Sequence, residues 1–175
     1  MSQIVGPNRD EALIHRLVEQ FRATRAGLAE PRDFDPVAEQ ARLNRLAERL
    51  SQAYGCPLAA SKGPAQEGAL FGGVRIPAEA TRTRTKRTRV PLSLTVEVSN
   101  FGGLATYRPV YDWSTPWSPE SPTPTHPDDR ERIEEALTRL GYRVVPTHVL
   151  DTPYDGPNSD PNFRTTWYIR FFDIL

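Results

Sequence analysis

The sequence of 175 residues predicts a single α+β domain in which helices pack on one face of a mostly antiparallel sheet. Two amphipathic helical patterns open the chain, and patterns of period two typical of strands follow them. Short turns join neighbouring strands, whereas a parallel sheet would need long crossover connections. The predicted element order is ααβββαββ, and a chain of this length is sufficient for one hydrophobic core.

Two helices are predicted before the first strand. Apolar residues recur near helical spacing over residues 9–28, and Asn8 precedes them at a position suited to an N-cap. A second helix is predicted over residues 36–54. Asp35 can cap it, proline occupies its first position, and Gly55 supplies the left-handed residue that commonly ends a helix.

The central segment predicts three strands, and one of them has a regular alternation. Residues 69–76 form the first strand, and residues 92–99 alternate leucine or valine with serine, threonine or glutamate. Such a strand buries one face and exposes the other. Residues 100–103 contain two glycines and predict a turn, after which residues 104–111 return as the second strand of a hairpin.

The C-terminal third begins with a loop rich in proline, serine and threonine at residues 112–127. A third helix starts at Pro127 with Thr125 or His126 as its cap, and Gly141 ends it. Strands are then predicted over residues 142–150 and 165–175, with a turn-rich loop between them. The last segment carries aromatic residues at both odd and even positions, which favours an interior strand.

The overall charge gives the chain no general attraction for nucleic acid or for anionic membranes. Acidic and basic residues number 22 each, so the formal net charge is zero. The single cysteine, Cys56, cannot form an intramolecular disulfide, which fits a reducing compartment. No apolar run resembles a signal peptide or a membrane span. We therefore expect a cytoplasmic protein that does not act at a membrane.

A basic run is the first candidate binding segment. Arginine, lysine and threonine alternate over residues 81–89, and the five cations of the run are Arg82, Arg84, Lys86, Arg87 and Arg89. They could contact phosphates or enter an acidic cleft of a protein partner. The alternative is a solvated loop or strand extension whose charges resist edge pairing. No aromatic residue interrupts the run, so it offers no base stacking of its own.

Aromatic residues in and beside the proline-rich loop form the second candidate. Tyr111, Trp113 and Trp117 could serve as contact residues, since tyrosine and tryptophan are frequent at interface hot spots. They could equally fold back over the sheet as a lid.

Catalytic and metal-binding patterns are weak. No histidine has a known catalytic spacing to Cys56, so a small buried thiol is expected there. His126, Asp128, His148 and Asp151 follow no strong metal-ligand pattern, and capping explains His126. The chain also lacks the common phosphate-binding and hydrolase motifs. We expect a protein that is not an enzyme and that holds no metal and no cofactor.

Three stretches of the C-terminal half resemble small bacterial immunity proteins of polymorphic toxin systems. They are residues 98–102 (VSNFG), residues 149–156 (VLDTPYDG) and residues 166–173 (TWYIRFFD). The resemblance implies a protein that neutralises a cognate toxin by direct binding, and it transfers no functional residue. The sequence leaves two other classes open: a nucleic-acid-associated accessory protein that uses residues 82–89, and an enzyme of unrecognised class.

Overall fold

The computed structural model describes Arg16 and residues 34–62, 70–101, 103–111, 123–154 and 165–172. The predicted helix over residues 9–28 lies outside the described residues except for Arg16, and so does most of the predicted loop after residue 111. The described elements, in chain order, are α2 (Pro36–Tyr54), β1 (Ala60–Lys62), β2 (Leu70–Ile76), β3 (Ser93–Ser99), β4 (Leu104–Val110), α3 (Pro127–Arg139), β5 (Arg143–Val144), α4 (Thr147–Leu150) and α5 (Trp167–Phe172).

A five-stranded sheet in the order β1-β2-β3-β4-β5 confirms the α+β class. The first three pairings are antiparallel, and only the short pairing of β4 with β5 is parallel. The predicted strands 69–76, 92–99 and 104–111 match β2, β3 and β4 closely. The short edge strand β1 was not predicted.

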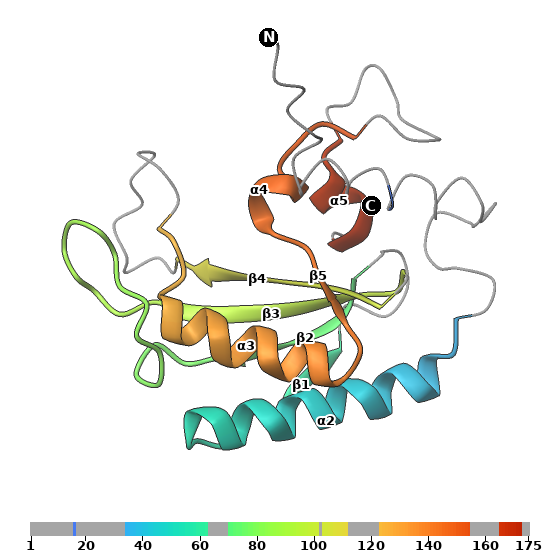
Figure 1. The fold of residues 1–175 in the computed structure, drawn as a ribbon, viewed down its shortest axis with the longest axis horizontal. Coiled ribbons are helices and arrows are strands. Elements are labelled where there is room, and N and C mark those ends of the chain that lie inside the picture. The colour runs from blue at the N-terminus through green and yellow to red at the C-terminus, as the bar shows by residue number, and fades with distance from the viewer. Residues whose placement is uncertain are drawn as a thin grey trace, which may run out of the picture.

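Helices α2 and α3 cover one face of the sheet, as the sequence predicted (Figure 1). The apolar residues of β3, namely Leu94, Val96 and Val98, are fully buried against the leucines of α2 and against Ile133 and Leu137 of α3. Asp35 caps α2 by accepting hydrogen bonds from the Val37 and Ala38 amides, and Gly55 ends the helix with a φ of 67°. Both end signals predicted for this helix are confirmed.

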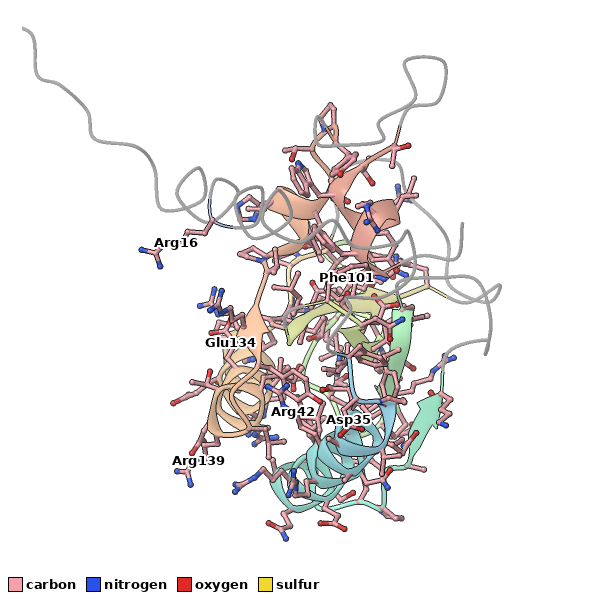
Figure 2. All side chains as sticks on the ribbon, turned by 90° about the vertical axis from the view of Figure 1, so that its right-hand side faces the viewer. Arg16, Asp35, Arg42, Phe101, Glu134 and Arg139 are labelled. Atoms are coloured by element: carbon pink, nitrogen blue, oxygen red, sulfur yellow. The ribbon has the colours of Figure 1, made fainter. Side chains whose placement is uncertain are left out.

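Arg42 fastens α2 to the end of α3 (Figure 2). Its Nε donates a 2.8 Å hydrogen bond to the Leu140 carbonyl, and its guanidinium lies 3.6 Å from the centre of the Tyr142 ring. The Tyr142 hydroxyl in turn donates to the Glu39 carboxylate at 2.7 Å. Burial and this hydrogen bond raise the pKa of Tyr142. These contacts hold α2 and α3 together beneath the sheet.

The second face of the sheet is covered in part by the two short helices, α4 and α5, which the sequence did not predict (Figure 1). Phe101 lies beneath α5 (Figure 2) and packs edge-on against Phe171. This second core also buries Leu104, Val149, Leu150, Tyr154 and Trp167. As a result Ser99 and Glu97, on the face of β3 predicted to be polar and exposed, are buried as well.

The two predicted C-terminal strands are largely wrong. Residues 167–172 form helix α5, in which Trp167 stacks on Phe171 and Tyr168 on Phe172, each pair four residues apart. That spacing places each pair on one side of a helix, and in so short a segment it also resembles a strand with two apolar faces. Of the predicted strand 142–150, only Arg143–Val144 forms a strand, β5. Pro146 interrupts the segment and is the N-cap residue of α4.

Candidate functional site

The basic run lies in a folded-back loop between β2 and β3, which we call the basic hairpin and define as residues 81–91. It projects from the end of the sheet at which β2 ends and β3 begins, near the start of α3 (Figure 1). Arg84 and Pro91 form an antiparallel bridge, the Leu92 amide donates to the Thr83 carbonyl at 3.0 Å, and the Thr85 amide donates to the Val90 carbonyl at 2.9 Å. The hairpin is therefore an ordered element with its own backbone hydrogen bonds.

Threonines and cations of the basic hairpin point in opposite directions. Thr81, Thr83 and Thr85 are all buried, whereas the side chains of Arg82, Lys86, Arg87 and Arg89 are exposed. The Thr81 hydroxyl donates to the Leu92 carbonyl at 2.7 Å. The Thr85 hydroxyl lies 2.7 Å from that of Thr88 and also accepts from the Val90 amide at 2.9 Å. The alternation seen in the sequence thus separates an inner polar row from an outer row of positive charge.

Asp129 of α3 anchors the base of the hairpin. Its side chain is fully buried, and one carboxylate oxygen accepts three hydrogen bonds, from the Arg82 amide at 2.8 Å, the Thr83 amide at 2.8 Å and the Thr83 hydroxyl at 2.7 Å. The Thr83 hydroxyl also accepts from the His126 amide at 3.0 Å. Hydrogen bonds to a buried charge are among the stronger ones in proteins, so this contact fixes where the hairpin leaves the domain.

The five predicted cations have different local partners. Arg82 forms an ion pair with Asp128, and Arg84 donates to the carbonyls of Thr81 at 2.8 Å and Thr83 at 2.9 Å. Within the part of the chain that the structure describes, Lys86, Arg87 and Arg89 form no ion pair. Among the described residues, the tip of the hairpin therefore presents three cations without an ion-pair partner, while the guanidinium of Arg84 holds the hairpin itself together.

Arg89 has an unusual backbone conformation. Its φ of 58° is left-handed, and no other non-glycine residue among those described has a positive φ. Glycine or asparagine adopts this region at lower cost than arginine does. The Thr85 carbonyl, which accepts the Arg89 amide at 3.2 Å, closes the turn. Arg89 thus places a cation at a position where the backbone conformation favours glycine.

The second predicted site lies mostly outside the described residues. Trp113 and Trp117 both fall in residues 112–122, so their prediction stays untested. Tyr111 is half-buried at the end of β4, and its hydroxyl accepts a 3.1 Å hydrogen bond from the Thr123 amide. Tyr111 therefore links the residue before the proline-rich loop to Thr123 in the last part of that loop.

Glu97, Arg108 and Tyr168 form a polar cluster on the second face of the sheet that sequence reasoning missed. The Tyr168 hydroxyl lies 3.1 Å from each carboxylate oxygen of Glu97, and Arg108 reaches Glu97 at 3.2 Å and the Tyr168 hydroxyl at 2.5 Å. The Arg108 guanidinium also lies 4.5 Å from the centre of the Tyr168 ring. These contacts tie α5 to β3 and β4, and Glu97 is mostly shielded from solvent by them.

Perturbed tyrosines lie on the other face, where α2 and α3 pack. Burial and a 2.5 Å hydrogen bond to Glu134 raise the pKa of Tyr107. Burial and the nearby Asp129 charge raise the pKa of Tyr54 in the same way. Each hydroxyl stays protonated at neutral pH and donates a hydrogen bond, that of Tyr107 to the Glu134 carboxylate and that of Tyr54 to the Asp129 carbonyl. Both residues thus stabilise the packing of helices against the sheet.

The remaining candidates of the sequence give no site in the described residues. Those residues contain no group of three or more histidine, cysteine, aspartate or glutamate side chains that could hold a metal ion. Cys56 is half-buried rather than buried, just after the end of α2. His126 caps α3, since its Nδ1 accepts the Asp128 amide at 3.2 Å, as the sequence predicted. His148 is exposed in α4.

Comparison of the chain with protein-family models, with curated proteins and with solved structures found no match. No helix in the described ranges has the length and apolar character needed to cross a bilayer.

Proposed function

We propose that this chain is a non-catalytic binding protein of the cytoplasm that uses the basic hairpin to contact an acidic partner. One observation supports the proposal above the others: buried threonines and Asp129 anchor the base of the hairpin while the cations at its tip face solvent. An ordered loop loses less conformational entropy on binding than a flexible one, so its charges bind more effectively. A merely solvated loop would not require a buried carboxylate to fix its backbone.

The partner proposed is a protein, and the class of binding protein proposed is the immunity type. An exposed row of arginine and lysine complements an acidic cleft, such as the active site of a toxin that must bind cationic groups or a metal ion. The resemblance of residues 98–102, 149–156 and 166–173 to immunity proteins favours the same class. Tyr111, Trp113 and Trp117 remain proposed contacts of the partner.

A tagged pull-down from the cells that make the protein tests the proposal. It is performed with and without nuclease, and the recovered proteins are identified by mass spectrometry. The proposal expects one stoichiometric protein that survives nuclease, and its recovery should fall when Arg87 and Arg89 are replaced by glutamate. Recovery that depends on intact nucleic acid would instead favour an accessory protein that binds DNA or RNA. A partner that is retained equally by the glutamate variant would refute the hairpin as the contact.

A further inference from the structure

Arg82 and Asp128 form an exposed ion pair beside the anchor of the basic hairpin. The Arg82 side chain is 59% exposed and the Asp128 side chain 42% exposed. Their neighbour Asp129 is fully buried and binds the backbone of the same segment. Two adjacent acids of α3 therefore act on one arginine in different ways, because Asp129 holds its amide and Asp128 neutralises its guanidinium.

Asp128 contributes little to the position of the hairpin. The three hydrogen bonds of Asp129 bind the backbone and the Thr83 hydroxyl, so the hairpin stays anchored when the side chains of Arg82 and Asp128 separate. Asp128 also has other favourable surroundings. It lies in the first turn of α3, where the helix dipole stabilises negative charge.

We propose that Asp128 occupies the place of a partner's carboxylate, and that binding of an acidic protein segment exchanges that carboxylate for Asp128 on Arg82. This inference rests on the proposed function, since it requires the hairpin to be the contact surface. Exposed ion pairs contribute little to stability, so exchanging Asp128 for a partner's carboxylate costs the domain little free energy. The released Arg82 then adds a fourth exposed cation to Lys86, Arg87 and Arg89 of the hairpin. Asp128 thus competes with the partner for Arg82, and removing its charge should raise the affinity for the partner.

The chemistry of the pair favours a protein over a nucleic acid as the partner. The Arg82 guanidinium already binds a carboxylate, and arginine and carboxylate match in shape and hydrogen bonding. The hairpin carries no aromatic side chain on which a base could stack. An acidic segment with spaced aspartates or glutamates needs no stacking surface, because its side chains can be placed singly against each cation.

The test measures binding of fluorescently labelled poly-L-glutamate to the full chain by anisotropy at physiological ionic strength, with a DNA duplex as the second probe. The variant is Asp128→Asn, and the matched control is Glu135→Gln. Glu135 also forms an exposed ion pair on α3, with Arg139 at 2.7 Å. Arg139 is the last residue of α3, and its side chain points away from the sheet (Figure 2). Both substitutions remove one negative charge from an exposed ion pair of α3, so a difference between them does not come from net charge.

We expect Asp128→Asn to bind poly-L-glutamate about 2- to 5-fold more tightly than the unmodified chain, the range that an exposed ion pair allows, and Glu135→Gln to change affinity far less. In an Arg82→Gln background, Asp128→Asn should have no effect. Equal gains for the two variants, or a gain that persists without Arg82, would overturn the exchange. Preference of the unmodified chain for the duplex would overturn the choice of a protein partner.

The proposed function fails separately from this inference. If the pair Arg87→Gln and Arg89→Gly leaves binding of poly-L-glutamate unchanged, the hairpin is not the contact surface. If that pair abolishes binding while Asp128→Asn matches Glu135→Gln, the surface stands and the exchange is refuted. Thermal unfolding of each variant shows that the fold is intact.

Discussion

Replacing Asp129 by alanine should detach the basic hairpin from the domain and lower the stability of the fold. The substitution removes the acceptor of three hydrogen bonds of 2.7 to 2.8 Å at a fully buried position. A buried donor left without an acceptor costs about 1–3 kcal/mol. The three costs do not add fully, because the three bonds share one acceptor and lie next to one another. We expect a loss of about 3 kcal/mol in the free energy of unfolding.

Urea unfolding followed by circular dichroism measures that loss, and hydrogen exchange of the Arg82 and Thr83 amides reports the hairpin directly. Both amides should exchange much faster in Asp129→Ala. Asp128→Asn is the control, because it changes the next residue and a single charge without touching the anchor, and it should cost less than about 1 kcal/mol. A loss below 1 kcal/mol for Asp129→Ala together with unchanged amide exchange would refute the anchoring role.

Three further predictions concern single residues. Tyr107→Phe should cost about 1 kcal/mol at pH 7, because it removes the hydrogen bond to Glu134. Since the folded state raises the pKa of Tyr107, its stabilisation is full below pH 10 and is lost above it, so the variant should lose less stability than the unmodified chain during alkaline titration. Gly73→Ala should cost at least about 2 kcal/mol in urea unfolding, because its Cβ would lie 2.4 Å from the Val96 carbonyl oxygen; an unchanged midpoint would contradict that close approach. Arg89→Gly should keep or slightly raise the thermal midpoint while weakening partner binding, and a large drop in the midpoint would show that the left-handed backbone there carries no strain.

Local signals predicted the first half of the fold well. Asp35 and Gly55 mark the two ends of α2. Both signals are visible in the sequence because capping oxygens and left-handed glycines act within a few residues of the helix end. The alternation of β3 also predicted which of its residues face the main core. It could not predict that α5 would cover the other face and bury Glu97, because that contact depends on a segment about 70 residues further along the chain.

The C-terminal errors have the same physical origin. In the segment that forms α5, six residues are too few to separate a helical period from a strand period, and large aromatic side chains suit either. Packing of Trp167, Phe171 and Phe172 against the second core decides the outcome. Pro146 was a usable signal, since proline inside an apolar run argues against a central strand.

The candidate site was predicted in part. The alternation of threonine with cations identified the segment, but the sequence did not show that Asp129 would fix it or that Arg84 would bind its own backbone. Asp129 lies in the first turn of α3, where an acid is already explained by the helix dipole, so nothing in the sequence marks a second role. Its second role requires the start of α3 to lie against the hairpin, which is a contact between residues almost 50 positions apart.

Hydrogen exchange of the chain in complex with the partner recovered by pull-down tests the central claim most directly. If the basic hairpin is the contact surface, amides of residues 82–90 should gain protection on binding, and the gain should be lost with the Arg87→Glu and Arg89→Glu substitutions. Protection confined to other segments, with exchange in the hairpin identical in the free and bound chain, would contradict the proposal that this protein binds its partner through an ordered row of cations.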